Sequence, residues 1–309
     1  MGEIKSALVA GAGAIGSMVA WQIDRALPGA VSILAGGERL ARYRERGFIV
    51  NGERRDFPLT DVESSAGCDL VIVACKNHHL PQVIRDLDRH VGPETLILSL
   101  LNGISSEEEI GEAFGSWRIP YAMIIGTDAG HADNRTTFSK TGTIFFGDAT
   151  NGASPSPRVA AIADFLSRAG VAHSVPENML NRLWYKYMMN VGMNQVTAVL
   201  RRPYRIFKEG TAVSEACGLM NAAMREVIAV AAKEGITLTD DDIKSVYATA
   251  QTLGDEGKTS MCQDVEAGRK TEVELFSGKL LELAGRHGVP VPVNSILYDL
   301  LRSIEKSYT

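Results

Sequence analysis

Hydrophobic residues in the first half of the chain form short continuous runs, and segments of helical composition separate these runs. Strands buried on both faces have this pattern, and such burial is typical of a parallel sheet with helices on each side. We therefore expect a βαβ series. Its strands lie within "IKSALVAG" (4–11), "VSILA" (31–35), "DLVIVAC" (69–75) and "TLILSLL" (95–101), and its helices over 14–27, 38–46, 79–89 and 106–114.

The pattern changes over residues 118–149, where Gly, Asp and Asn interrupt the apolar runs. The runs "RIPYAMIIG", "RTTFSK" and "GTIFFGD" indicate late antiparallel strands, which we expect to extend the sheet. A turn-rich joint at 151–157, a helix at 158–169 and an extended segment at 171–175 then complete the first domain.

Strand patterns nearly vanish from residue 176 onward, and the rest of the chain has helical periodicity. A length of 309 residues suits two domains better than one core. We therefore expect domains 1–175 and 176–309, the second of them all-helical. Its helices are expected over 177–200, 210–234, 240–256, 272–286 and 295–306.

The stretch "GAGAIG" joins the first expected strand to the first expected helix. In this context Gly11 permits a tight turn, Gly13 lets a pyrophosphate approach the backbone, and Gly16 lets the helix pack on the sheet. N–H groups at the helix start then bind the phosphates. The pattern predicts a Rossmann-type doubly wound domain, the alternative being a glycine turn with no ligand. The predicted cofactor contacts are Gly11, Ala12, Gly13, Ala14, Ile15 and Gly16.

The end of the second strand bears on which dinucleotide binds. An acidic residue there would bind the ribose 2′-OH of NAD and repel the 2′-phosphate of NADP. The strand ends instead in Gly36-Gly37, followed by Glu38 and then by Arg39 and Arg42. The missing acid and the nearby arginines favour NADP, and Glu38 can be an ordinary first-turn acid.

Composition excludes several classes of partner. The net charge of −5 and the pI of about 5.8 give no sign of a nucleic-acid or anionic-membrane partner. No apolar run approaches the ~20 residues of a membrane span. The cysteines form no CxxC or Cys/His cluster, so we expect no metal site and a reducing, cytoplasmic location. They are Cys68, Cys75, Cys217 and Cys262.

The stretch "WYKYMMNVGMN" (184–194) carries Lys186, Asn190 and Asn194 at intervals of four residues. On an α-helix these side chains lie on one face, since each step of four residues drifts only about 40°. Asparagine is a poor mid-helix residue because it competes for backbone hydrogen bonds, so a polar ligand would explain the pair. The alternatives are a lysine that snorkels to water and asparagines that bind a loop.

Other polar residues are candidates for the same chemistry. Asn102 follows the fourth strand, at the carboxyl edge where such sheets bind ligands. Ser260 and Glu272 lie in a later polar stretch. Each also fits a helix start: Ser260-x-x-Gln263 and Thr271-x-x-Glu274 are capping-box patterns, the second making Glu272 a first-turn acid.

Taken in order, "GAGAIG", "CK" (75–76), "LLNG" (100–103), "WYKYMMNVGMN", "TSMCQD" (259–264) and "TEVE" (271–274) resemble the motifs of the ketopantoate reductase (2-dehydropantoate 2-reductase) family. These motifs span nearly the whole chain. The resemblance implies a homodimeric enzyme that reduces a small 2-oxo acid with NADPH, bound in a cleft between the two domains. Ketopantoate is then the lead substrate.

The resemblance also implies roles for single residues. Lys186 becomes the general acid that protonates the carbonyl oxygen, and Glu272 lies near this lysine and the cofactor ribose. Asn190, Asn194 and Ser260 bind the substrate. Two further residues belong to the cofactor side: Asn102, where nicotinamide and substrate meet, and Lys76, near the cofactor.

The sequence departs from the family pattern at two places. The family commonly has an arginine near the end of the second strand, where this chain has Ala35-Gly36-Gly37, so Arg39 or Arg42 would have to reach back. Tyr204 or Arg205 stands where members of the family carry another substrate-binding asparagine. Two alternatives therefore stay open: a reductase of another 2-oxo acid, and a non-catalytic NADP(H)-binding regulator.

Overall fold

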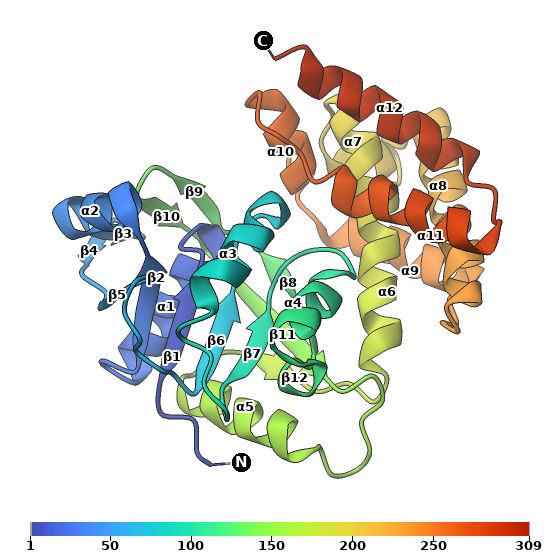
Figure 1. Cartoon of the computed structure of the whole chain (residues 1–309). Coiled ribbons are helices and arrows are strands. Elements are labelled where there is room, and N and C mark those ends of the chain that lie inside the picture. Colours follow the sequence, from blue (N-terminus) through green and yellow to red (C-terminus); the bar gives the residue numbers. More distant parts are fainter. Residues whose placement is uncertain (1, 309) are drawn as a thin grey trace. The chain divides into compact units, whose positions relative to one another are not determined.

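The computed structural model describes residues 2–308, which form two compact units (Figure 1). The first unit contains the chain up to Asn102 together with Ser106–Leu180. The second unit contains Gly103–Ser105 and the chain from Asn181 onward.

The first unit is built on a five-stranded sheet in the order β5-β2-β1-β6-β7. Every neighbouring pair in it is parallel, and Ala7 of β1 lies opposite both Val31 of β2 and Leu70 of β6. The predicted parallel sheet is therefore confirmed. Its strands are β1 (Ala7–Ala10), β2 (Val31–Ala35), β5 (Leu59–Asp61), β6 (Leu70–Val73) and β7 (Leu96–Ser99).

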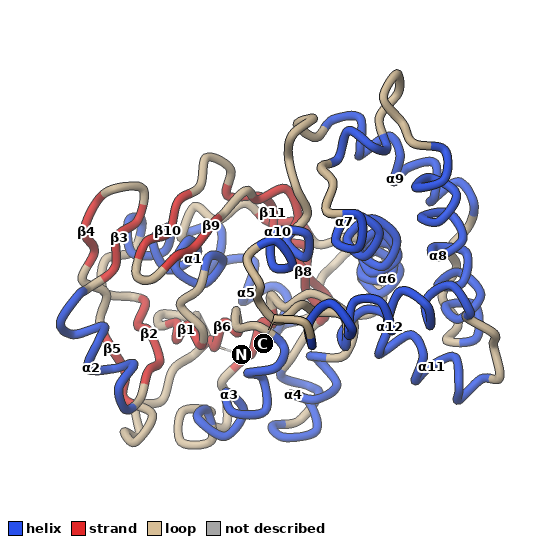
Figure 2. Tube along the Cα trace, turned by 90° about the horizontal axis from the view of Figure 1, so that it is seen from above, coloured by secondary structure: helices blue, strands red, loops and turns tan. Residues whose placement is uncertain are grey.

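Helices cover both faces of this sheet, which explains why its strands are apolar without alternation. Val9 and its neighbours on one face pack with α1 (Ala14–Ala26) and α5 (Pro157–Arg168). Leu8 and its neighbours on the other face pack with α3 (Leu80–Leu87) and α4 (Ser106–Phe114). Figure 2 shows α1 and α5 on one side of the strands and α3 and α4 on the other.

The late strands do not extend this sheet, so that expectation was wrong. β8 (Tyr121–Thr127) and β11 (Thr141–Gly147) are antiparallel, as predicted, but with β12 (His173–Ser174) they form a separate three-stranded sheet. β10 (Arg135–Thr137) joins a four-stranded sheet in the order β4-β3-β10-β9. The other strands of that sheet are β3 (Phe48–Val50), β4 (Glu53–Arg55) and β9 (Gly130–Ala132).

The run pattern missed β3 and β4 because each has only three residues. A local signal was nevertheless present: Asn51 and Gly52 connect the two strands, with φ of 49° and 85°. Positive φ at both central residues is what a two-residue type I′ hairpin requires, and Asn-Gly is its preferred sequence. This hairpin supplies the edge with which β10 pairs.

The second unit is helical, as predicted, and the fold class is confirmed. The expected helix over 177–200 is not one α-helix: α6 (Met179–Met189) passes into a π-helix, η3 (Asn190–Asn194), and then into α7 (Gln195–Leu200). A short α10 was not predicted. The other helices are α8 (Ser214–Lys233), α9 (Asp240–Thr252), α10 (Ser260–Glu266), a second π-helix η5 (Glu274–Gly278), α11 (Lys279–His287) and α12 (Pro292–Lys306).

Smaller elements complete the structure. They are α2 (Gly37–Arg46) and the 3₁₀ turns η1 (Asn77–His79), η2 (Ser116–Arg118) and η4 (Tyr204–Phe207). Among the described residues, no helix is both long enough and apolar enough to cross a membrane.

Candidate functional site

The glycine loop between β1 and α1 has the shape that its glycines predict. Gly11 has φ of 108°, and a Cβ there would lie 2.7 Å from the Cys75 backbone nitrogen. A Cβ on Gly16 would lie 1.9 Å from the Gly11 carbonyl oxygen. A side chain at either position would thus force the loop or the helix to move. These two glycines let β1, α1 and the end of β6 approach one another.

Gly13 differs, because a Cβ there would have nothing within 4 Å. It is the N-cap of α1, and among residues 2–308 no side chain caps this helix end. The first turn carries no acidic residue either. Open space beside uncapped N–H groups and a positive helix end fits the pyrophosphate of a dinucleotide.

The other predicted cofactor residues in this unit follow the ends of neighbouring strands. Arg39 is exposed on α2, after β2, and Lys76 is exposed after β6. Asn102 is half-buried after β7. Since the carboxyl ends of parallel strands meet at one edge, these residues share that edge with the glycine loop. The structure therefore brings the first group of predicted residues to one side of the sheet.

The second group begins with Lys186 and two asparagines in the other unit. Each of the three is largely buried, with exposed fractions of 7% for Lys186, 6% for Asn190 and 8% for Asn194. Within residues 2–308, no hydrogen bond joins the carboxamide of Asn190 or Asn194 to another protein group. Their amide atoms are not among the fully buried polar atoms that lack a partner, so they stay open to solvent and can bind a polar ligand.

The π-helix changes the expected geometry of this face. An α-helical step of four residues overshoots a full turn by about 40°. The wider turn of a π-helix, closed by i→i+5 bonds, undershoots it instead. The α step from Lys186 to Asn190 is thus followed by a π step to Asn194 that reverses the drift. The three side chains stay in line more closely than the predicted α-helix would hold them.

Ser260 is exposed and is the first residue of α10. The alternative of a capping box at Ser260 was wrong, because the N-cap is Thr259, whose hydroxyl accepts a hydrogen bond from the Cys262 N–H at 3.1 Å. Thr259 can do this because its backbone is extended, whereas Ser260 is already helical. The serine hydroxyl is therefore not used as a cap.

Glu272 is 7% exposed and precedes the π-helix η5. The alternative of a capping box at Thr271 was also wrong: the Thr271 hydroxyl accepts the Val273 N–H at 3.3 Å, but the Thr271 N–H does not donate to Glu274. Both the N–H and the hydroxyl of Thr271 donate to Glu305 of α12, at 2.7 and 2.6 Å, while Glu274 accepts from Tyr298. Glu272 is thus a buried residue beside a π-helix, not a first-turn acid of an α-helix.

The segments that carry this second group pack together. The π-helix η3 contacts both α10 and η5. The Tyr187 hydroxyl donates to the Phe276 carbonyl oxygen at 2.6 Å, which ties α6 directly to η5. The structure therefore gathers the elements of Lys186, Ser260 and Glu272 within the helical unit.

The Tyr204 region is held against the loop before α10. The Tyr204 N–H donates to the Gly257 carbonyl oxygen at 2.9 Å, and a Cβ on Gly257 would lie 3.0 Å from the Tyr204 ring. Burial raises the pKa of Tyr204 above its usual value. Sequence reasoning pointed to Tyr204 but missed Gly257, whose lack of a side chain leaves room for the ring.

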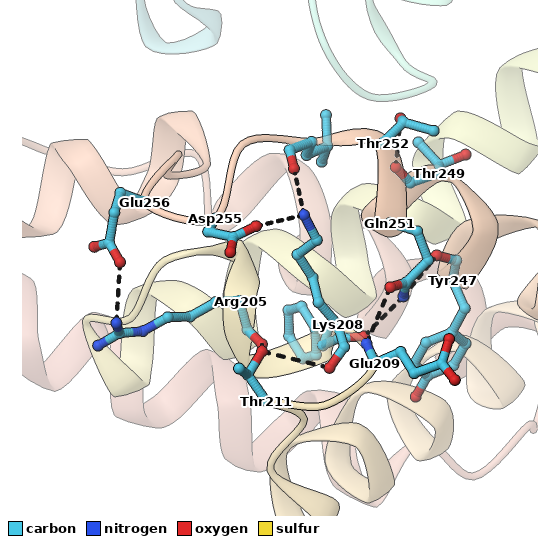
Figure 3. A network of polar contacts seen from close by, with 12 residues as sticks. Arg205, Lys208, Glu209, Thr211, Tyr247, Thr249, Gln251, Thr252, Asp255 and Glu256 are labelled. Carbon is cyan, nitrogen blue, oxygen red and sulfur yellow. Dashed lines mark hydrogen bonds and ion pairs between the residues drawn. The ribbon is translucent and has the colours of Figure 1, made fainter.

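Polar contacts fix the chain that follows Tyr204 (Figure 3). Arg205 pairs with Glu256 at 3.0 Å, and the Lys208 ammonium donates to the Leu253 carbonyl oxygen at 2.7 Å and also pairs with Asp255. The loop is thus fastened at several points. Among the described residues, no cluster of three or more His, Cys, Asp or Glu could hold a metal ion.

Two family models match the chain. Residues 7–151 match "Ketopantoate reductase PanE/ApbA", and residues 178–305 match "Ketopantoate reductase PanE/ApbA C terminal". The 2-dehydropantoate 2-reductase of Streptococcus pyogenes serotype M1 is 24% identical over 304 residues, covering 96% of this chain and 97% of the relative. That of Halobacterium salinarum is 27% identical over 311 residues, covering 97% and 98%.

Solved structures share the fold. A D-mandelate dehydrogenase bound to NADH and anilino(oxo)acetate is 24% identical, with a TM-score of 0.84 over 98% of this chain and 99% of that one. A dimeric ketopantoate reductase from Staphylococcus aureus is 20% identical, with a TM-score of 0.80 over 98% of this chain and 100% of that one.

Proposed function

Because the chain belongs to the ketopantoate reductase family of oxidoreductases, we propose that it reduces a small 2-oxo acid with NADPH, ketopantoate to pantoate being the lead reaction. We assign cofactor binding to residues 1–175 and the catalytic side chains to residues 176–309. The observation that carries the proposal is the buried line of one ammonium and two unpartnered carboxamides on α6 and η3.

The chemistry follows from these groups. The Lys186 ammonium binds the keto oxygen and stabilises the negative charge that develops on it. As the C=O double bond is reduced, its electron pair moves to oxygen, and Lys186 gives that oxygen a proton. The neutral amine then regains a proton from solvent. A bound NADPH supplies the hydride that the keto carbon receives.

The remaining residues orient the substrate and the cofactor. Asn190 and Asn194 donate amide hydrogens to the carboxylate or hydroxyl oxygens of the substrate, and Ser260 offers the substrate a further hydroxyl. Glu272 and Asn102 contact the ribose and the nicotinamide side. Binding a 2-oxo acid by amides alone would leave its negative charge unbalanced, so the lysine serves both attraction and catalysis.

The choice of NADPH rests on the end of β2. No acidic side chain ends this strand, and a Cβ on Gly36 would lie 2.4 Å from Val62, so the position has no room for a larger residue. Arg39, exposed in the first turn of α2, and Lys76 would hold the 2′-phosphate and the cofactor phosphates. The negative charge of Glu38 would repel the 2′-phosphate of NADPH. The test therefore compares NADPH with NADH.

One observation favours a different 2-oxo acid. The Tyr204 ring fills the space beside Gly257, so this end of the substrate site would present an aromatic surface where a polar asparagine was expected. Such a surface suits an apolar or aromatic substituent better than the hydroxymethyl group of ketopantoate. The alternative is therefore a dehydrogenase of aryl or branched 2-oxo acids.

The test is NADPH oxidation, followed by loss of nicotinamide absorbance, with ketopantoate, pyruvate, 2-oxoisovalerate and benzoylformate, repeated with NADH. The highest kcat/KM for ketopantoate with NADPH supports the lead reaction. Preference for benzoylformate or 2-oxoisovalerate, lost in Tyr204→Ala, supports the alternative. Binding of NADPH with no turnover of any substrate leaves a non-catalytic regulator.

We further propose a homodimer, since the relative from Staphylococcus aureus is described as dimeric. Light scattering after gel filtration measures this: a mass near twice 33.3 kDa supports the dimer, and a mass near 33.3 kDa contradicts it.

A further inference from the structure

Two side chains complete the hydrogen bonding of the π-helix η3. A π turn shifts the backbone pairing from i+4 to i+5 and so displaces carbonyl groups from their usual donors. The Gln195 side-chain amide donates to the Val191 carbonyl oxygen at 2.8 Å, and the Thr197 hydroxyl lies 2.9 Å from the Met193 carbonyl oxygen and 3.1 Å from that of Asn194. Gln195 and Thr197 thus add side-chain hydrogen bonds to three backbone carbonyls of η3.

Gln195 also connects η3 to the second π-helix. Its side-chain oxygen accepts a hydrogen bond from Ser277 of η5 at 2.6 Å, and its amide nitrogen donates to Asn294 at 3.2 Å. All three residues are 0% exposed. Ser277 follows Glu272 by five residues, so this contact joins the segment of the asparagines to the segment of the glutamate.

Asn294 is itself fixed on its other side. Its amide donates to the Ala223 carbonyl oxygen at 3.1 Å and to Glu226 at 2.8 Å, and Glu226 also accepts the N–H groups of Val293 and Asn294. Glu226 thereby caps the start of α12 from α8. The buried network is fully paired from α8 to η3.

Thr197 makes the matching connection to α10. Its hydroxyl lies 2.8 Å from the hydroxyl of Thr259, the N-cap of the helix that begins with Ser260. Thr197 and Thr259 are 0% and 2% exposed. The two arms of the network therefore lead from one π-helix to the two other segments that carry candidate site residues.

We propose that Gln195 and Thr197 are positioning residues, which hold η3 in its π form and set Asn190 and Asn194 in register with Ser260 and Glu272. The inference rests on the proposed function, because it concerns the same substrate site. Neither residue touches the reacting atoms. Each acts through the carbonyls of η3 and through the hydroxyl on the neighbouring segment.

The main variants are Gln195→Met, which keeps size but removes the amide, and Thr197→Val, which keeps shape but removes the hydroxyl. Thr197→Ser restores the hydroxyl. Val246→Ala is the matched control, because Val246 is 0% exposed on α9 in the same unit and makes only apolar contacts through its side chain. It lowers stability by removing buried apolar atoms.

Steady-state kinetics separates positioning from simple destabilisation. We expect Gln195→Met and Thr197→Val to raise KM for the 2-oxo acid about tenfold or more, since small misplacements of binding groups have large effects. The Kd of NADPH, measured by fluorescence, should stay at the wild-type value. Thr197→Ser should return KM toward wild type. Val246→Ala should lower Tm and leave KM unchanged.

Hydrogen–deuterium exchange gives a readout that does not need turnover. We expect Gln195→Met to speed exchange in residues 190–194 and also in residues 274–278, and Thr197→Val in residues 190–194 and 259–262. Val246→Ala should speed neither pair of segments selectively.

Each result decides the inference. It is overturned if both variants lower Tm as Val246→Ala does, with KM and local exchange unchanged. If Gln195→Met does not fold, the Thr197→Val and Thr197→Ser pair decides it. If the wild-type protein reduces no 2-oxo acid, the proposed function fails, and coupled exchange between the segments still tests the positioning role.

Discussion

The two units prepare their candidate sites in opposite ways. In the first unit the site is made of backbone: three glycines, an uncapped helix end and open space beside Gly13. In the second unit the site is made of side chains, Lys186, Asn190 and Asn194, on a helix whose backbone is distorted to align them. The candidate site of the first unit depends on positions without side chains, and that of the second unit depends on buried polar side chains.

The difference shows how each kind of site responds to change. A backbone site is damaged by adding atoms, because any Cβ either displaces the loop or occupies the ligand space. A side-chain site is damaged by removing atoms, because the amides and the ammonium are the proposed binding groups. Substitutions can therefore test the comparison from both directions.

The largest effect should come from removing the ammonium on α6. Lys186→Ala should lower kcat about 10²- to 10⁴-fold, because it removes the proposed general acid. Circular dichroism and Tm should show an intact fold. Lys244→Ala, at an exposed lysine of α9 paired with Asp241, is the control and should keep wild-type kcat. Wild-type turnover in Lys186→Ala would refute the mechanism.

Adding one methyl group to the glycine loop should have the next largest effect. Gly13→Ala should weaken NADPH binding about 10- to 100-fold with little change in Tm, since its Cβ meets no protein atom. Gly16→Ala should weaken binding and also lower Tm, since its Cβ would lie 1.9 Å from the Gly11 oxygen. Fluorescence titration and thermal unfolding measure the two quantities.

The control for these variants is Gly152→Ala, at an exposed glycine whose added Cβ also meets nothing within 4 Å. It should change neither quantity. Equal Tm for Gly13→Ala and Gly16→Ala would show that the loop can relax, and that the close approach at Gly16 does not matter.

A smaller effect should follow from removing one carboxamide. Asn194→Ala should raise KM for the 2-oxo acid about tenfold. The free energy of unfolding should stay within about 1 kcal/mol of the wild-type value, with a correspondingly small change in Tm. The reason is that no protein group loses a hydrogen bond to this amide among the described residues. A large fall in Tm with unchanged KM would make Asn194 a structural residue.

The smallest effect concerns the stability of the first unit. Burial acts to raise the pKa of Asp69, but hydrogen bonds from the Lys5 and Ser6 N–H groups and the Ser6 hydroxyl lower it. Stability from a lowered carboxyl pKa is present above the unfolded value and is lost as pH falls through the folded value.

Asp69→Asn should therefore lower the free energy of unfolding at neutral pH by about 0.5 kcal/mol, a small value because the carboxylate is partly exposed to solvent. The difference from wild type, present at neutral pH, should be lost at an acidic pH below the lowered pKa of folded Asp69. Urea unfolding at the two pH values measures it, and an equal difference at both would mean that charge plays no part.

The first unit could be predicted in greater detail than the second. Continuous apolar runs identified four of the five strands of the parallel sheet, because both-face burial leaves a direct mark on composition. The separate sheets around β8 and β10 could not be inferred, since which edges pair depends on the tertiary neighbours of short strands.

In the second unit, sequence spacing identified Lys186, Asn190 and Asn194 but predicted an α-helix. The π geometry has no marker in the local sequence, and contacts of this segment such as the one between Gln195 and Ser277 form only after distant parts of the chain meet. The capping-box alternatives at Ser260 and Thr271 failed for a similar reason: the pattern was present, but Thr259 is the N-cap in place of Ser260, and Glu305 accepts the Thr271 N–H.

The position of β1 has a consequence for biosynthesis. β1 precedes the other strands of its sheet along the chain, yet it is the middle strand of that sheet, between β2 and β6. A nascent chain that ends after β2 already contains the whole glycine pattern, but it lacks the backbone of Ala74 and Cys75 against which Gly11 turns. Until β6 has been synthesised, the glycine loop therefore lacks the backbone that lies next to Gly11, and we expect it to take its shape only in longer chains.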